Sequence, residues 1–228
     1  MRRLFYLVGI TLVAASALLA PPALASTMWT DWTSATLGVN GGGSATGSVG
    51  GVGVSYSGEL DSAITNGSSN LWSPNSSFIG GTSTTSPSTV GDDLRLNGSF
   101  TGVDTITFAS PIVNPLIAIW SLGAPGISAT FTFAQTPTFE VGGPNSQFGG
   151  MPINVVGNVV SGSEGNGVVQ FTGTFSSISW TNSFENFYAF TIGTADTTTS
   201  VPEPATMLLL GVGLVGLAVF GRKTLFTN

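Results

Sequence analysis

The sequence predicts an all-β fold, a single β-sandwich resembling a jelly roll. Apolar and polar residues alternate in short runs, for example over residues 128–133, and such alternation is typical of half-buried strands. Segments rich in Gly, Pro and Asn separate the runs at intervals of roughly 8 to 15 residues, the spacing of a sandwich or jelly roll. Residues 26–200 contain no amphipathic helical window of useful length.

The N-terminal part of this domain has the weaker pattern. Residues 38–53 are dense in Gly and Ser, and residues 52–56 alternate against a bare opposite face, which predicts a strand there. Residues 61–91 consist mainly of Ser, Thr, Asn, Gly and Pro. We expect a long loop with short edge strands, because a structureless loop of this length is unusual in a compact domain.

From residue 94 onward the strand pattern is stronger. The runs 94–100 and 104–109 alternate, whereas Pro111 and Pro115 indicate a break. The run 116–122 is apolar throughout, apart from one serine, and predicts a strand buried on both faces. Further strands are expected at 129–133, 139–141, 153–160, 169–175, 178–180 and 188–192.

Composition narrows the class of function. Between residues 26 and 202 there is one cation, Arg95, against ten Asp and Glu, a net charge of −9. Such a surface disfavours nucleic acid and anionic lipid headgroups as partners. The 228-residue chain has no Cys and no His, so we expect no disulfide, no His- or Cys-based nucleophile and no ordinary zinc site. We expect no enzymatic activity and no cofactor.

The N-terminus has the features of a secretory signal peptide. A basic pair at residues 2–3 precedes the apolar run 4–20, and Ala23 and Ala25 form the small-x-small pattern that signal peptidase reads. We expect cleavage after Ala25; the alternatives are cleavage after Ala20 and an uncleaved anchor. The predicted organisation is a signal peptide (1–25), a β-sandwich (26–194), a polar linker (195–201) and a C-terminal segment (202–228).

The C-terminal segment predicts a membrane helix. Residues 205–221 are 17 uncharged residues, at the short end of what spans a bilayer core of roughly 30 Å. Pro202 and Pro204 cannot continue that helix upstream, and Arg222 and Lys223 would hold its other end on the cytoplasmic side. The alternative is a buried core helix.

The order of Pro202, Glu203 and Pro204, an apolar helix and a basic end resembles the PEP-CTERM protein-sorting signal of Gram-negative bacteria. The resemblance implies processing near the motif by exosortase, a membrane-embedded enzyme similar to cysteine transpeptidases. It also implies transient anchoring in the inner membrane, delivery to the cell surface or extracellular matrix, and a host that makes extracellular polysaccharide. The basic cluster has two residues, fewer than in many relatives, and residues 224–228 follow it.

The tryptophans suggest a carbohydrate-binding alternative, because flat aromatic faces stack on sugar rings. Trp29, Trp32 and Trp72 have polar neighbours in the sequence and are the better candidates for exposure, which makes them the candidate glycan contacts. Trp120 and Trp180 have apolar neighbours and are expected in the core.

Carboxylates supply the remaining alternatives. A glycoside-active enzyme needs two of them converging in a cleft, and only Glu140 lies in a strand-like run. Asp92 and Asp93 could ligate Ca²⁺ together with loop carbonyls, or they could form an acidic turn paired with Arg95; we expect no metal. The candidates are Glu59, Asp61, Asp92, Asp93, Asp104, Glu140, Glu164 and Glu185.

Overall fold

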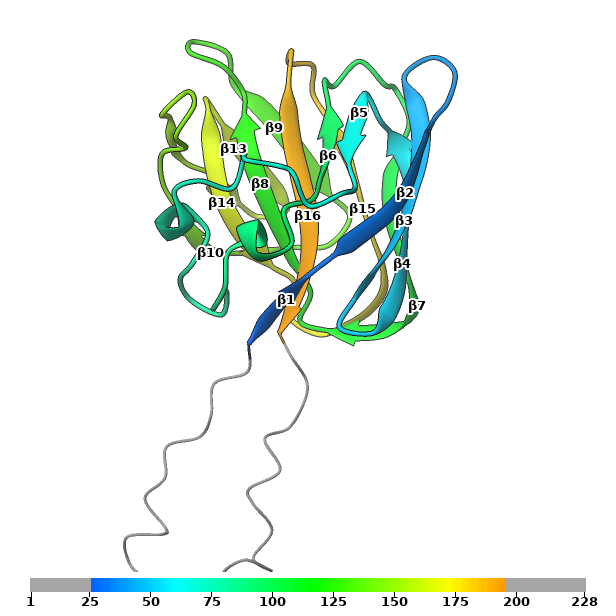
Figure 1. The fold of residues 1–228 in the computed structure, drawn as a ribbon. Helices are drawn as coiled ribbons and strands as arrows, with labels where there is room; N and C mark the ends of the chain where they lie inside the picture. Colours follow the sequence, from blue (N-terminus) through cyan, green and yellow to red (C-terminus); the bar gives the residue numbers. More distant parts are fainter. Residues whose placement is uncertain (1–25, 196–228) are drawn as a thin grey trace, which may run out of the picture. The chain divides into compact units, whose positions relative to one another are not determined.

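The computed structural model describes residues 26–195. This part of the chain is all-β, with two eight-stranded sheets packed against each other (Figure 1), which confirms the predicted fold class. Among these residues no helix is long and apolar enough to cross a membrane. The predicted signal peptide and membrane helix lie outside the described residues.

One sheet, here named the covered sheet, has the strand order β10-β14-β8-β16-β6-β5, with β1 paired to β16 and β11 paired to β14. The β11–β14 pair is parallel and the others are antiparallel. Its strands are β1 (Thr27–Trp29), β5 (Ser62–Ile64), β6 (Asp93–Leu96), β8 (Leu116–Leu122), β10 (Thr138–Gly142), β11 (Met151–Pro152), β14 (Gly165–Gln170) and β16 (Tyr188–Ala195).

The second sheet, here named the open sheet, has the order β12-β13-β9-β15-β7-β4-β3-β2, and every neighbouring pair is antiparallel. Its strands are β2 (Asp31–Leu37), β3 (Gly42–Val49), β4 (Val52–Glu59), β7 (Asp104–Val113), β9 (Ala129–Phe133), β12 (Asn154–Val156), β13 (Val159–Gly162) and β15 (Thr174–Asn182).

Aromatic side chains fill the space between the two sheets. The Trp180 ring of β15 lies 5.1 Å from the Phe190 ring of β16 in a T-shaped arrangement and 5.7 Å from the Phe131 ring of β9. Edge-to-face and offset arrangements of this kind are the favoured ones. The inward positions of the alternating strands therefore form one core shared by both sheets.

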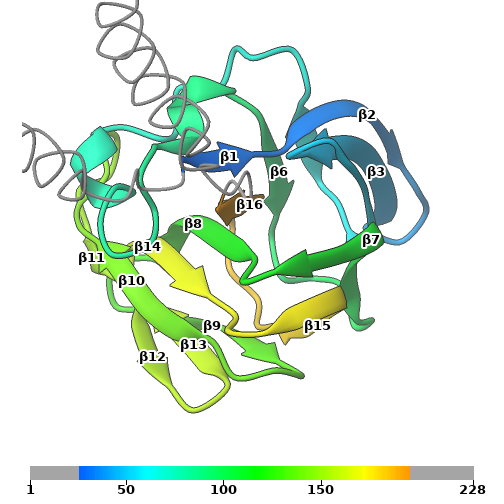
Figure 2. The same ribbon diagram turned by 90° about the horizontal axis from the view of Figure 1, so that it is seen from below.

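The outer face of the covered sheet lies beneath residues 65–91, here named the covering loop (Figures 1 and 2). As predicted, β8 is buried along its whole length. The covering loop contributes Leu71, Trp72 and Phe78 to a second apolar cluster that includes Leu116 and Trp120 of β8. It contains two short 3₁₀ segments, Asn75–Ser77 and Pro87–Thr89. The expected loop is present, and its buried apolar residues cover the outer face of the sheet.

Polar contacts fasten the covering loop to β1 and β10. The Thr27 amide donates to Thr84 Oγ1 at 2.7 Å, and Trp29 Nε1 donates to the Thr85 carbonyl at 2.9 Å. On the other side, Glu140 of β10 accepts from the Thr82 amide at 2.7 Å and from the Thr82 hydroxyl at 2.9 Å. Glu140, predicted as the carboxylate of a strand, thus holds the loop.

The break predicted between Pro111 and Pro115 is present but shorter than expected, because β7 runs through Pro111 to Val113 and β8 begins at Leu116. Proline removes a ladder donor and is tolerated at bulges and edges. The pairing of β4 with β7 stops at Phe108. The register of β15 against β7 shifts between Phe175 and Ser177. Pro111 therefore lies where neither neighbour needs its amide.

The glycine-rich stretch 38–53 contains β3 and the turn that joins it to β4. Gly50 and Gly51 form that turn with φ of 56° and 78°. Two successive residues with positive φ are what a tight hairpin turn requires. Glycine is thus needed at this turn; the start of the stretch forms a second turn before β3, where Gly41 has a φ of 80°.

Candidate functional site

The expectation that Trp29, Trp32 and Trp72 are exposed is wrong. Their exposed fractions are 3%, 0% and 1%. Trp72 lies under the covering loop, edge-on to Phe78 at 5.3 Å, and its Nε1 donates to the Asp92 carbonyl at 2.9 Å. A ring buried in this way offers no face to a sugar. Trp29 and Trp32 lie in the strands β1 and β2, and Trp72 lies in the covering loop; in each case polar residues flank a side chain that is itself buried.

The other two tryptophans lie where the sequence predicts. Trp120 and Trp180 are 1% and 2% exposed. Trp120 contacts Phe187 at 5.5 Å between ring centres, and Trp180 stacks on Tyr56 at 6.1 Å. The prediction that both belong to the core is confirmed.

The Asp92–Asp93 pair lies at the start of β6, and Asp93 is paired with Arg95 rather than placed in a ligand cluster. Asp93 accepts from Arg95 Nε at 2.6 Å, the ion pair that the sequence offered as the alternative to calcium. Asp92 accepts from the amides of Trp32 and Gly67, both at 2.8 Å, and burial raises the pKa of its carboxyl. Residues 26–195 contain no group of three or more acidic, His or Cys side chains placed to hold a metal.

Glu59, at the end of β4, is the best-satisfied buried carboxylate. Its Oε1 accepts from the amides of Ser99 and Phe100 at 2.8 and 3.2 Å, and its Oε2 accepts from the Gly98 amide at 2.8 Å. Asn182 Nδ2 adds a bond to Oε2 at 2.6 Å. Three backbone amides and one side-chain amide thus hold the Glu59 side chain in place. This side chain therefore fixes the loop between β6 and β7.

Asp104, at the start of β7, lies beside Glu59. Its Oδ1 accepts from the Tyr56 hydroxyl and from the Glu59 amide, both at 2.6 Å, while its Oδ2 has no hydrogen-bond partner. Burial raises the pKa of Asp104 to about 6. Burial likewise raises the pKa of Tyr188, which accepts from Asn182. Asp104 and Tyr188, with their hydrogen-bond partners, thus place polar side chains inside the sandwich.

Glu59 and Asp104 are linked through the Glu59 backbone amide, which donates to Asp104 Oδ1. Their exposed fractions are 1% and 0%, so a substrate has no access to either in this structure. Both make bonds that stabilise strand ends and a loop. Their partners Tyr56 and Asn182 had no signal in the sequence, since Asn182, for example, lies 123 residues from Glu59.

A second acidic contact lies at the end of β8. The Ser121 hydroxyl donates to Glu164 Oε2, and both residues have positive φ, 57° and 58°. Glu185 is 5% exposed, one of its oxygens has no hydrogen-bond partner, and burial raises the pKa of its carboxyl.

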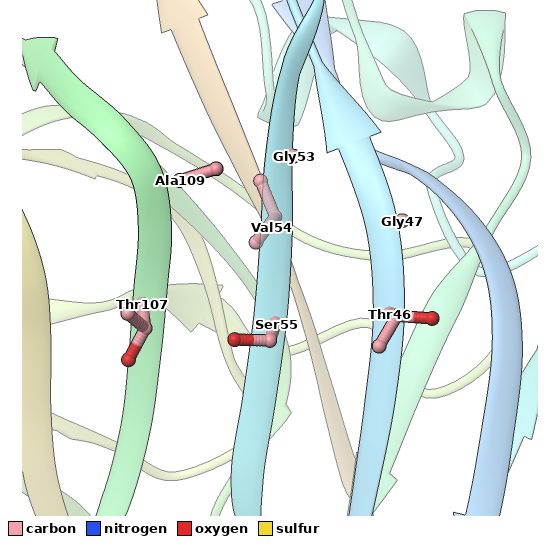
Figure 3. A pocket seen from close by; sticks show the side chains of 7 residues that line it. All are labelled: Thr46, Gly47, Gly53, Val54, Ser55, Thr107 and Ala109. Atoms are coloured by element: carbon pink, nitrogen blue, oxygen red, sulfur yellow. The ribbon is translucent and has the colours of Figure 1, made fainter.

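The outer face of the open sheet carries a different kind of surface. A depression of about 300 Å³ lies over β3, β4 and β7. Figure 3 shows Thr46, Ser55 and Thr107 beside it, while Gly53 and Ala109 leave it uncovered. The sequence indicates which positions of each alternating strand are polar. It does not indicate that the polar positions of neighbouring strands lie side by side.

The candidate residues for export and sorting lie outside the described residues. They are Ala23 and Ala25 at the signal-peptidase site, the motif Pro202, Glu203 and Pro204, and the stop residues Arg222 and Lys223.

The described residues define an all-β domain, and the sequence after it bears a sorting signal. The family model of the PEP-CTERM protein-sorting motif matches residues 200–223, so the chain carries this motif, as the resemblance implied. The motif supports export and sorting to the cell surface or a membrane, with exosortase as the implied processing enzyme. No curated protein and no solved structure matches the chain.

Proposed function

We propose that the protein is a non-enzymatic component of the cell surface or extracellular matrix, associated with extracellular polysaccharide. It is held transiently in the inner membrane by residues 205–221 and is processed by exosortase near Pro202, Glu203 and Pro204. The match of residues 200–223 to the PEP-CTERM motif carries this proposal.

Two features of the domain support a structural role. Its buried carboxylates bind backbone amides, hydroxyls or Arg95 rather than facing a cleft. In addition, β1 and β16 are paired, with Thr27 opposite Ala195. Both connections to the rest of the chain therefore leave from the same end of the domain, which suits a domain displayed on a C-terminal tether.

The sorting proposal is tested by replacing the motif in a host that has exosortase. We expect Pro202→Ala, Glu203→Ala and Pro204→Ala together to keep the protein in the inner-membrane fraction with Asn228 intact. Wild type should reach the surface fraction with a shortened C-terminus, as measured by mass spectrometry. The matched control replaces Thr197, Thr198 and Thr199 with Ala and should behave as wild type. Surface-fraction wild type that retains Asn228 would contradict the proposal.

Association with polysaccharide is tested in the same host without its polysaccharide locus. We expect the processed protein to move from the cell-associated fraction to the medium. An unchanged distribution would show that the protein is retained by something else, such as the outer membrane.

A carbohydrate-binding domain is the second candidate function. Its first support, the exposure of Trp29, Trp32 and Trp72, is lost because these side chains are buried. A different observation favours it instead: the hydroxyl-bearing outer face of the open sheet.

A further inference from the structure

Two rows of hydroxyl side chains cross five neighbouring strands of the open sheet, β2, β3, β4, β7 and β15. In each row the residues are direct cross-strand partners. The first row is Ser34, Thr46, Ser55, Thr107 and Ser177, and the second is Thr36, Ser44, Ser57, Thr105 and Ser179. We name the two rows together the hydroxyl face.

The hydroxyl face is regular because the sheet fixes its spacing. Neighbouring strands lie about 4.8 Å apart, and residues on one face of a strand repeat every ~6.7 Å. All five members of the first row are exposed, as are three of the second; Thr105 and Ser179 are half-buried. Backbone pairing therefore holds the ten residues at regular positions, and the strands need no further ordering when a ligand binds.

Most of these hydroxyls are available to a ligand. Ser34 Oγ and Thr46 Oγ1 are hydrogen-bonded to each other at 2.7 Å. The other hydroxyls of the two rows make no hydrogen bond to another of the residues 26–195. Each hydroxyl offers one donor and two acceptor sites, so the face can exchange hydrogen bonds in both directions with a partner that also carries hydroxyls.

The face carries no charge: neither row contains Lys, Arg, Asp or Glu. Threonine suits an exposed strand on propensity alone, but serine is not among the residues that strands favour. Strand propensity therefore does not account for the serines that make up the rest of both rows.

A hollow adjoins the first row. Beyond Thr46, Ser55 and Thr107, the next positions on β4 and β7 are Gly53 and Ala109, and the depression of about 300 Å³ lies there (Figure 3). A Cβ added to Gly53 would meet only Ala109 Cβ, at 3.4 Å. The hollow is thus left by small side chains and can be filled without a clash.

We propose that the hydroxyl face binds a neutral, extended β-linked polysaccharide, with the hollow receiving a projecting sugar substituent. This deepens the proposed function and rests on it for the presence of such a polymer outside the cell. The rise of one β-linked sugar along an extended glycan is close to the distance between strands. A chain lying across the strands therefore meets a new hydroxyl at each sugar.

The negative charge of the domain favours a neutral polysaccharide over an acidic one. The described residues hold nine Asp and Glu against Arg95, so an acidic polysaccharide is repelled by the domain as a whole. A neutral polymer has no such penalty and matches the uncharged face. Because hydrogen bonds to exposed hydroxyls are individually weak, attachment depends on many sugars binding at once along one polymer.

The test uses the full-length chain in detergent micelles and two insoluble neutral β-linked glycans, cellulose and chitin, in a sedimentation assay. We expect wild type to bind at least one of them. The variant Ser55→Ala with Thr107→Val removes two hydroxyls while keeping side-chain shape, and should lower the association constant about ten-fold. The matched control, Thr101→Val with Ser128→Ala, removes two exposed hydroxyls elsewhere and should bind as wild type.

A second variant, Gly53→Val, fills the hollow and leaves both rows intact. We expect it to weaken binding as well. Tryptophan fluorescence checks that each variant is folded, and the Gly53 variant keeps the proposal testable if the double variant fails this check.

Several results would overturn the proposal. They are no binding of wild type to either glycan, equal binding by the double variant, and equal binding to alginate, an acidic glycan. A sedimentation velocity shift showing dimers that only the double variant loses would assign the face to a second copy of the chain. Inhibition of ice growth without glycan binding would assign it to ice. Sorting and processing are measured separately, so failure here leaves the proposed sorting by the C-terminal motif standing, and failure of the sorting test leaves the glycan-binding measurement unchanged.

Discussion

The two sheets have the same number of strands. They differ in their outer faces, the faces turned away from the shared core. On the covered sheet, β8 is buried on both sides because the covering loop packs on it. On the open sheet, β7 alternates between buried and accessible positions from Asp104 to Phe108, and its outward side chains are threonines. The covered sheet is therefore buried on both faces at β8, whereas the open sheet has one face exposed to solvent at β7.

This difference shows what the covering loop does. It has the composition of a linker, yet its few apolar residues, Leu71, Trp72 and Phe78, are buried. Widely spaced anchors are enough to cover a sheet when hydrogen bonds to β1 and β10 fix the polar segments between them. The outward side chains of β8 are thus apolar because the covering loop, a separate segment of the sequence, packs on them.

The largest expected effect is the loss of an anchor from the covering loop. Trp72→Ala should lower the free energy of unfolding by about 3–5 kcal/mol, because it leaves a cavity under the loop. All five tryptophans lie in the described domain, so fluorescence-detected urea unfolding of the full chain reports on this domain. The control is Phe184→Ala, whose side chain is 64% exposed and should cost little. A loss below about 1 kcal/mol for Trp72→Ala would mean that the loop is a loose cover.

The next effect concerns the inner side of the open sheet. Burial raises the pKa of Asp104 from 3.8 to about 6, so the folded state holds a proton that the unfolded state has released. The resulting stabilisation is fully present below about pH 4 and is lost as the pH rises through about 6, a change of roughly 3 kcal/mol. Asp104→Asn keeps the oxygen that accepts from Tyr56 and Glu59 but cannot ionise.

We therefore expect the free energy of unfolding of Asp104→Asn, relative to wild type, to rise by up to ~3 kcal/mol between about pH 4 and pH 7. Urea unfolding at several pH values measures this difference. Thr105→Val, one residue further along β7, carries no titratable group and should follow the wild-type pH profile. A difference between Asp104→Asn and wild type that does not vary with pH would contradict the assignment.

The smallest effects come from exchanging one side chain between the two outer faces. Val168→Thr places a hydroxyl under the covering loop, where Val168 is 0% exposed, and should cost about 1–3 kcal/mol. Thr107→Val makes the reverse change on the open sheet and should stay within about 0.5 kcal/mol. Urea unfolding of both variants measures the contrast. Equal costs would show that the open sheet is also covered.

The sequence predicted what depends on local pattern. The alternation of β9, the apolar run of β8 and the contiguous motif at residues 202–204 need no knowledge of distant residues. The burial of Trp72 was not predictable in this way, because it depends on a loop folding back over a sheet. Likewise, each strand showed its Ser and Thr positions, but the alignment of Ser55 with Thr107 depends on pairing between β4 and β7.

The proline at 111 shows a related limit. Its effect on a strand depends on whether a neighbour needs its amide, and that is set by where β4 stops and where β15 bulges. Neither can be read from the residues around Pro111.

The position of β16 has a mechanical consequence. It lies in the interior of the covered sheet, hydrogen-bonded to β8 and β6 and to β1, and it is the strand from which the chain continues toward the sorting motif. Tension between a surface-bound domain and its C-terminal attachment would act along the axis of β16. The load would then fall on the hydrogen bonds of all three pairings in shear, rather than opening them one after another. A domain loaded in this way resists mechanical unfolding from its C-terminal end.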